Sequence, residues 1–178
     1  MEKGPYLDSL TLVSGGQTGV DRAALDYCLD HRMSCGGWCP QSRKAEDGTI
    51  PLKYPVKELP GTSYKKRTAA NVRDSDATVI IFFREMIGGT LKSFEFVRKM
   101  EKPFLLLDMS VLDPSSAADR LLRFFGKYHP QTINFSGPRQ SDWPEAYTTC
   151  YQILQNAFSR NQKGPARKSV RSLKGLNT

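Results

Sequence analysis

Short apolar runs recur along the chain at intervals typical of alternating strands and helices. Residues 77–83 (ATVIIFF) form the strongest run, and its continuous apolar character is typical of a central parallel strand covered on both faces. Residues 10–13 and 104–107 are shorter apolar runs that also predict buried strands. Weaker strand patterns lie at residues 33–36, 54–59 and 132–135. These runs predict the strands of one sheet.

Helix-compatible segments lie between these runs, at residues 20–31, 64–73, 91–100, 117–128 and 143–158. Ser63 and Asp142 are expected to cap two of these helices, because their side chains can accept hydrogen bonds from first-turn amides. Strands that alternate with helices predict an α/β fold. We expect a single Rossmann-like domain over residues 10–158, with a mainly parallel β-sheet and helices on both faces.

A polar turn follows three of the predicted strands. These turns span residues 14–19 (SGGQTG), 84–90 (REMIGGT) and 136–141 (SGPRQS). Since the carboxyl ends of parallel strands share one edge of a sheet, where ligands of such folds bind, the turns are expected to meet. The first amides of the helices that follow favour an anion such as phosphate. The three turns therefore predict a site for an anionic, nucleotide-like ligand.

The first of these turns carries the most specific chemistry. Its glycines allow a tight turn and a close approach of ligand to main chain, Asp21 suits a helix start, and Arg22 is a natural anion partner. The spacing is not that of G-x-x-x-x-G-K-[ST], since no Lys follows, nor that of G-x-G-x-x-G. For this turn alone, a tight connection that binds nothing is the alternative.

Residues 37–48 (GWCPQSRKAEDG) have little periodicity and are predicted to form a loop. The mixture of aromatic, basic and acidic side chains is typical of a binding loop, with an ordinary surface loop as the alternative. Cys39 lies in this loop, whereas Cys28 and Cys150 fall on predicted helices and are expected in the core. The spacing of the cysteines and histidines is not that of a zinc site, so no protein-bound metal is expected.

Composition indicates the class of protein and the character of residues 1–9. With 178 residues, 39% of them hydrophobic, the chain is typical of one globular domain, and no apolar run approaches the roughly 18 residues of a membrane span. Residues 1–9 form an extension without the apolar stretch of a secretory signal, so a cytoplasmic location without membrane contact is expected.

The net charge of +8 belongs mostly to residues 159–178, which hold six Lys or Arg and no acid. This segment is predicted to be a disordered, basic tail. A solubilising role is the main interpretation, and contact with nucleic acid or anionic lipid is the weaker one.

Several stretches together resemble one known family. They are residues 14–26 (SGGQTGVDRAALD), 36–51 (GGWCPQSRKAEDGTIP), 64–76, 88–90 (GGT), 102–108 (KPFLLLD) and 133–141 (INFSGPRQS). Over residues 10–158 the sequence resembles the molybdenum cofactor carrier family, a Rossmann-like relative of the LOG or lysine-decarboxylase-like nucleotide hydrolases. The resemblance implies a carrier or storage protein for the molybdenum cofactor (molybdopterin), an anionic pterin phosphate. It also implies a homo-oligomer, a dimer or tetramer, that catalyses no reaction.

The resemblance further implies that the three turns and the loop at residues 38–43 contact the ligand. From the chemistry of these residues, we expect backbone amides and Thr90 to hold phosphate, and Arg43 and Arg139 to neutralise it. Trp38 is expected either to stack on a pterin or base, or to seal its loop on the core. The implied binding set is Gly15, Gly16, Gln17, Thr18, Gly19, Asp21, Arg22, Trp38, Cys39, Pro40, Arg43, Asn71, Ser75, Asp76, Gly88, Gly89, Thr90, Gly137, Arg139 and Ser141.

A LOG-like nucleotide monophosphate phosphoribohydrolase is the alternative function. Those enzymes carry a motif that resembles P-G-G-x-G-T-x-x-E, in which an acid lies three residues after Thr. Here the sequence reads MIGGTLKSFE, and Glu95 lies five residues after Thr90. Two extra positions turn a helical side chain by about 200°, so Glu95 is not expected in the catalytic position. Because no other acid has an evident catalytic partner, no catalytic residue is assigned.

Overall fold

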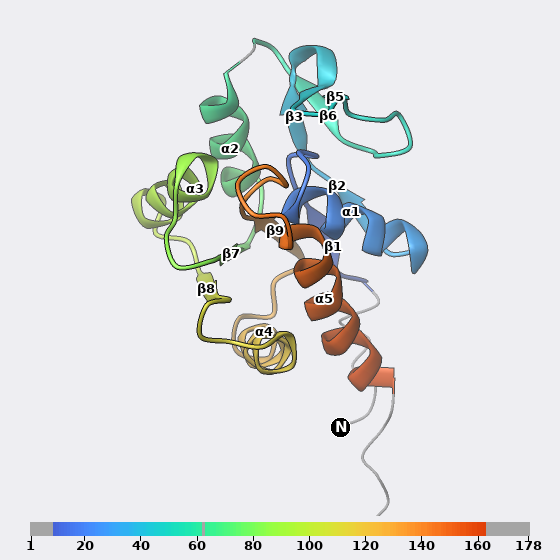
Figure 1. Cartoon of the computed structure of the whole chain (residues 1–178), viewed down its shortest axis with the longest axis vertical. Coiled ribbons are helices and arrows are strands. Elements are labelled where there is room, and N and C mark those ends of the chain that lie inside the picture. Colours follow the sequence, from blue (N-terminus) through green and yellow to red (C-terminus); the bar gives the residue numbers. More distant parts are fainter. Residues whose placement is uncertain (1–8, 62, 163–178) are drawn as a thin grey trace, which may run out of the picture.

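The computed structural model describes residues 9–61 and 63–162, with side chains through residue 159 (Figure 1). The predicted extension at residues 1–9 and tail at residues 159–178 lie almost wholly outside the described residues. In chain order the elements are β1 (Thr11–Val13), α1 (Val20–Asp30), β2 (Ser34–Gly36), β3 (Trp38–Pro40), η2 (Gln41–Arg43), β4 (Lys44–Ala45), β5 (Gly48–Thr49), β6 (Lys57–Leu59), α2 (Tyr64–Arg73), β7 (Ala77–Phe82), α3 (Gly88–Lys99), β8 (Phe104–Asp108), α4 (Pro114–Tyr128), β9 (Thr132–Ser136) and α5 (Ala146–Gln162).

The main sheet has five strands in the order β2-β1-β9-β7-β8, and every neighbouring pair is parallel. The last strand of the chain, β9, therefore lies in the centre. In its register, Asn134 is opposite Val13 of β1 and Thr78 of β7. This arrangement confirms the predicted α/β class with a mainly parallel sheet.

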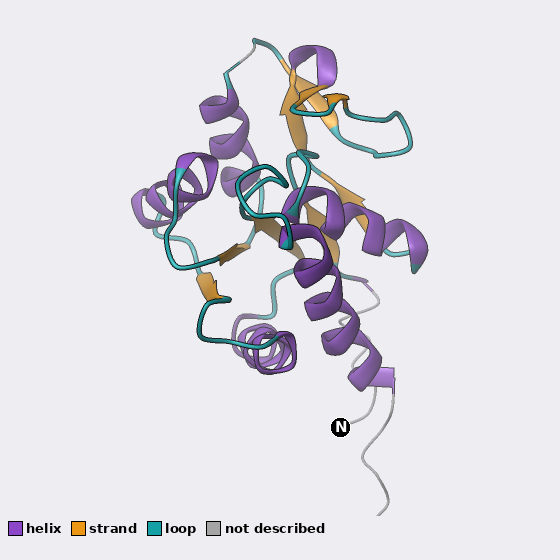
Figure 2. Cartoon of the chain, in the orientation of Figure 1, coloured by secondary structure: helices purple, strands orange, loops and turns teal. Residues whose placement is uncertain are grey.

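Helices cover both faces of this sheet (Figures 1 and 2). On one face α5 packs against both α1 and α4, and on the other face α2 packs against α3. Alternate residues of β7 serve the two faces, as the two-residue period of a strand requires. Val79 and Ile81 belong to the core with α1, α4 and α5, whereas Ile80 packs with Val72 of α2 and Val97 of α3.

The segment between β2 and α2 forms a small unit of its own. Strand β3 pairs in parallel with β6, and β4 pairs with β5 as an antiparallel hairpin. The prediction of a plain loop at residues 37–48 is therefore wrong. These strands have no local periodicity because their order comes from pairing and from a buried cluster. That cluster holds Leu25, Cys39, Ala45, Ile50, Tyr54 and Val56.

Some helix boundaries agree with the predicted ones, and others differ from them. Ser63 caps α2, since its side chain accepts a hydrogen bond from the Lys66 amide. Helix α3 begins at Gly88, earlier than predicted, because the two glycines form its first turn. The prediction that Asp142 caps the last helix is wrong. Its carboxylate accepts a hydrogen bond from Arg139 Nε at 3.1 Å, and α5 begins at Ala146.

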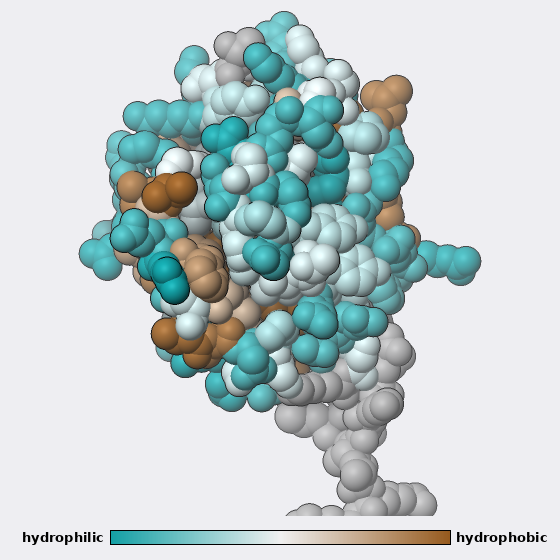
Figure 3. All heavy atoms as spheres, viewed as in Figure 1, coloured by the Kyte–Doolittle hydropathy of each residue, from teal (hydrophilic) through white to brown (hydrophobic). Residues whose placement is uncertain are grey.

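The face seen in Figure 3 is mostly hydrophilic, with hydrophobic atoms gathered toward its left. Exposed large apolar side chains of the described chain include Phe83, Ile87 and Val111, which follow β7 and β8. Within the described ranges, no helix is both long enough and apolar enough to cross a bilayer.

Candidate functional site

The turns after β1, β7 and β9 meet at the carboxyl edge of the sheet, because these strands are neighbours in the order β1-β9-β7. A cavity of about 600 Å³ lies there, a volume typical of sites for small ligands. All three turns contribute to it, together with α2 and the β4–β5 hairpin. The lining residues are Gln17, Asp21, Lys44, Ala45, Glu46, Tyr64, Lys65, Arg67, Thr68, Gly88, Gly89, Thr90, Lys92, Ser136, Gly137, Arg139 and Asp142.

The N-terminus of α3 forms one wall of the cavity. Its N-cap is Ile87, whose apolar side chain accepts no hydrogen bond from the first turn. A Cβ built on Gly88 or Gly89 meets nothing of the described chain within 4 Å, so the main chain there is open to approach. Helix N-termini carry unpaired amides and a positive dipole end. This wall can therefore accept an anion on its backbone.

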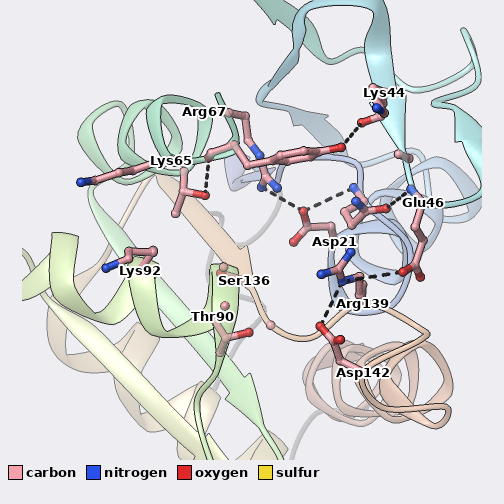
Figure 4. A pocket seen from close by; sticks show the side chains of 17 residues that line it. Asp21, Lys44, Glu46, Lys65, Arg67, Thr90, Lys92, Ser136, Arg139 and Asp142 are labelled. Atoms are coloured by element: carbon pink, nitrogen blue, oxygen red, sulfur yellow. Dashed lines mark hydrogen bonds and ion pairs between the residues drawn. The ribbon is translucent and has the colours of Figure 1, made fainter. Parts of the chain in front are cut away.

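Basic side chains surround this wall. Lys44, Lys65 and Lys92 line the cavity, and Arg67 and Arg139 complete the set. Figure 4 shows Lys65 and Lys92 on the opposite side of the pocket from Glu46. Among the described residues, only three acids, Asp21, Glu46 and Asp142, line the cavity against these five basic side chains, so its net charge favours an anionic occupant.

Arg67 and Asp21 form the most buried charged contact of the cavity. Arg67 Nη1 lies 3.2 Å from Asp21 Oδ2, and the two side chains are 13% and 6% exposed (Figure 4). Burial raises the pKa of Asp21, although Arg67 and the amides of Gln17 and Gly15 oppose the rise. Arg67 Nε is buried and has no hydrogen-bond partner among the described residues. One donor of this guanidinium is thus buried without a partner within the described chain.

The other glycines of the turns serve close packing within the chain. Gly19 has φ of +75°, and a Cβ built there lies 2.3 Å from the Pro138 carbonyl oxygen. A Cβ on Gly15 would lie 1.8 Å from Arg67 Nη1, and one on Gly137 would lie 2.5 Å from Val20 Cγ2. These glycines let the first and third turns contact each other and their neighbours directly. They shape the cavity, whereas Gly88 and Gly89 leave it open.

Comparisons with known proteins agree on the kind of protein. Residues 12–158 match the family described as the circularly permutated YpsA SLOG family. The chain belongs to this family. It is also similar to a solved structure from Syntrophus aciditrophicus SB described as "Putative molybdenum carrier protein". The two are 37% identical over 84% of this chain and 96% of that one, with a TM-score of 0.82. No curated protein matches the chain.

Within this YpsA SLOG chain, the structure brings part of the predicted binding set to the cavity. Gln17 and Asp21 of the first turn and helix line it, as do the three residues that open α3. The third turn contributes Gly137 and Arg139. The predicted residues that line the cavity are therefore Gln17, Asp21, Gly88, Gly89, Thr90, Gly137 and Arg139.

Other predicted residues of the first and third turns lie behind the cavity wall. Gly16 presents its carbonyl oxygen to Arg22, which also pairs with Asp47 at 2.9 Å. Thr18 and Ser141 donate their hydroxyls to Glu46. These contacts hold the turns and the β4–β5 hairpin together.

The predicted residues of the segment 38–43 lie away from the cavity. The Trp38 indole donates to Asp74 at 2.7 Å and lines a separate hollow of about 340 Å³. Cys39 and Pro40 are buried, and Cys39 belongs to the small apolar cluster. Arg43 donates to four backbone carbonyls, those of Ile50, Pro51, Tyr54 and Val56, at 2.8 to 3.0 Å. Structural contacts thus occupy these side chains.

Asn71, Ser75 and Asp76 lie toward the other end of α2 and the start of β7. The Asn71 amide group pairs with both backbone groups of Trp38, at 2.7 and 3.0 Å. Ser75 donates its hydroxyl to the Asn71 carbonyl. Asp76 accepts from the amides of Gln131 and Thr132, just before β9 begins. Asp76 therefore lies at the opposite edge of the sheet from the glycine turns.

Sequence reasoning missed the individual residues that α2 and the hairpin contribute, although it predicted a binding segment at residues 37–48. Tyr64, Lys65, Arg67 and Thr68 line the cavity from the first turns of α2. The sequence gives only a weak signal for them, because this helix has three basic residues in its first turns, Lys65, Lys66 and Arg67, and a weakly amphipathic pattern. The lining residues absent from the prediction are Lys44, Ala45, Glu46, Tyr64, Lys65, Arg67, Thr68, Lys92, Ser136 and Asp142.

Proposed function

We propose that this chain binds and carries the molybdenum cofactor, an anionic pterin phosphate, in the cavity at the carboxyl edge of the sheet. The observation that carries this proposal is the N-terminus of α3, which opens without steric cover into a cavity lined by five basic side chains. Membership of the YpsA SLOG family and the similarity to a protein named as a molybdenum carrier support the same kind of function.

The ligand phosphate is proposed to lie on the first turn of α3. Backbone amides at Gly88 and Gly89 would donate to it, because helix N-termini commonly bind phosphate in this way. Lys92 of α3 itself and Lys65 of α2 would supply charge on the same side of the cavity as this helix start. Arg67, which also lines the cavity, would add positive charge beside Asp21.

The chain is proposed to contact the phosphate and the ring system of the cofactor, whereas the metal is part of the ligand that is carried. No group of three or more His, Cys, Asp or Glu side chains gathers to hold a metal within the described residues. The cavity walls offer amide, hydroxyl and basic donors for phosphate and for polar ring edges. Molybdenum, where present, would be held by the cofactor that is carried.

Native mass spectrometry of protein purified from a host that makes molybdenum cofactor tests the proposal. We expect a bound mass equal to that of a pterin phosphate, with molybdenum detected by metal analysis of the same sample. The same spectrum counts the subunits of the proposed homo-oligomer. A protein without this mass, which also fails to take up cofactor added in excess, would refute the carrier function.

A screen of nucleoside monophosphates distinguishes the carrier from the alternative function, a hydrolase of the LOG type. Glu95 pairs with Lys92 at 2.7 Å, its side chain is 47% exposed, and it is absent from the cavity lining. Glu95 therefore does not replace the acid that LOG enzymes carry three residues after the motif Thr. Release of free base from a nucleoside monophosphate by the purified protein would favour the enzyme over the carrier.

A further inference from the structure

A carboxylate of the chain itself lies among anion-binding groups beside the cavity. Glu46, at the tip of the β4–β5 hairpin, accepts hydrogen bonds from the hydroxyls of Thr18 and Ser141. It also accepts from the Ser141 amide at 3.2 Å and lies 3.7 Å from Arg139 Nε. Two hydroxyls, one amide and one guanidinium thus surround a single carboxylate.

These donors form a site that suits a ligand phosphate as well as a carboxylate. Phosphate and carboxylate groups both prefer charge-assisted hydrogen bonds from Arg, hydroxyl and amide donors. The contacts from Ser141 and Thr18 outweigh burial and lower the pKa of Glu46, so the side chain is ionised at neutral pH. The site therefore already holds a full negative charge.

Glu46 also separates two hollows of the molecule. It lines the main cavity of about 600 Å³ and a neighbouring hollow of about 640 Å³. Within the described chain it is the one residue common to the two linings. Displacing this side chain would join the two spaces at the turns that bear Thr18 and Ser141.

Different contacts hold the base and the tip of the hairpin. Arg43 fixes the base by its hydrogen bonds to four carbonyls, and the Ile50 amide donates to the Arg43 carbonyl at 2.7 Å. The tip is tied by the Glu46 carboxylate, by the Glu46 amide, which donates to Gln17 Oε1 at 2.9 Å, and by Asp47, which accepts two hydrogen bonds from Arg22 at 2.9 and 3.2 Å. Because Asp47 is 47% exposed, solvent screens its pair with Arg22 in part.

We propose that Glu46 is an internal competitor that occupies a second anion subsite, formed by Thr18, Ser141 and Arg139, and that a phosphate group must displace it to bind there. This inference rests on the proposed function, because it describes how the same cavity is regulated. Glu46 closes the subsite in the absence of an anion, and the tip of the hairpin moves outward when phosphate takes its place.

Titration with inorganic phosphate and pyrophosphate by calorimetry tests this inference with the substitution Glu46→Gln. The amide is isosteric and still accepts from Ser141, but it lacks the charge that competes with phosphate. We expect affinity to rise about tenfold, the scale of one removed like charge near a protein surface. Asp47→Asn is the matched control on the same hairpin tip, and we expect it to change phosphate affinity by less than about twofold.

A second substitution tests whether the gain in phosphate affinity arises at the proposed subsite. Adding Ser141→Ala to the Glu46→Gln chain removes a donor of the subsite, so most of the gain in affinity should be lost. Equal affinity of the wild type and Glu46→Gln, including no binding to either, would overturn the inference. So would a gain that survives Ser141→Ala, because the phosphate would then lie elsewhere.

Hydrogen exchange provides an independent readout in the wild type. Phosphate should speed exchange at residues 44–47, because the Glu46 amide loses its bond to Gln17 Oε1 when the tip moves. Slower exchange there would show that the hairpin stays closed and would refute displacement. Failure of the carrier function has a different signature: no cofactor is retained, while the phosphate response of Glu46→Gln persists.

Discussion

Replacing Gly19 by Ala probes the contact between the first and third turns. Gly19 has φ of +75° and ψ of −130°, a conformation that costs an L-residue about 1–3 kcal/mol. The new methyl carbon would lie 2.3 Å from the Pro138 carbonyl oxygen and 2.9 Å from Arg139 Cα. Relief of such overpacking costs about another 1–3 kcal/mol. We therefore expect Gly19→Ala to lower the free energy of unfolding by about 4 kcal/mol.

Urea denaturation followed by circular dichroism measures this change. We expect a lower midpoint with an unchanged m-value, because the surface exposed on unfolding stays the same. A loss of this size is a large part of the roughly 5–15 kcal/mol that stabilises a typical domain. A Gly19→Ala protein within about 1 kcal/mol of the wild type would refute the argument that this glycine is required by packing.

Gly89→Ala is the matched control, because its φ is not positive and the added methyl group meets no described atom within 4 Å. Alanine in a helix is favoured over glycine by up to about 1 kcal/mol, so stability should stay equal or rise. The methyl group would project toward the cavity, and ligand affinity should fall by about 1–2 kcal/mol. A destabilised Gly89→Ala protein would show that the wall at α3 is packed and not open.

The remaining predictions concern three charged side chains. Arg43→Met removes hydrogen bonds to four carbonyls and should destabilise the chain by about 3 kcal/mol in thermal melts, with ligand affinity unchanged; lost affinity at full stability would contradict this. Arg139→Ala should weaken ligand binding by about 1–2 kcal/mol in calorimetry while the fold is retained, and an unchanged affinity would remove Arg139 from the site. The hydrogen bond from Arg22 lowers the pKa of Asp47, so this pair stabilises the fold above the usual carboxyl pKa and its contribution is lost as pH falls through the lowered value. Because Asp47 is 47% exposed, Asp47→Asn should reduce the difference in unfolding free energy between neutral pH and about pH 3 by only about 0.5 kcal/mol, and an unchanged difference would contradict the assignment.

Much of the fold could be predicted because its strands and helices are encoded locally. The run at residues 77–83 is apolar enough to identify β7 alone, and Ser63 marks the start of α2 through its own side chain. The meeting of the three turns at one edge could also be predicted, since turns after parallel strands share an edge. The strand order could not be read, because it depends on which strands pair across long stretches of chain.

Individual site residues were harder to predict for the same reason. Trp38 looked like a stacking residue, but its partners Asn71 and Asp74 come from α2 and its end, more than thirty residues later. Arg43 looked like an anion ligand, yet the carbonyls that surround it appear only when its segment folds back on itself. Residue type and local spacing identify the chemistry of a side chain, whereas tertiary contacts decide where that chemistry is used.

The central place of β9 has a consequence for the order of assembly. β9 pairs with β1 on one side and β7 on the other, so the pairs β1–β2 and β7–β8 cannot join until it inserts between them. During synthesis β9 leaves the ribosome after every other strand of the sheet. Such distant pairings slow folding and leave strand edges exposed in the nascent chain. The cavity, which needs the turns after all three strands, therefore cannot be completed before β9 inserts.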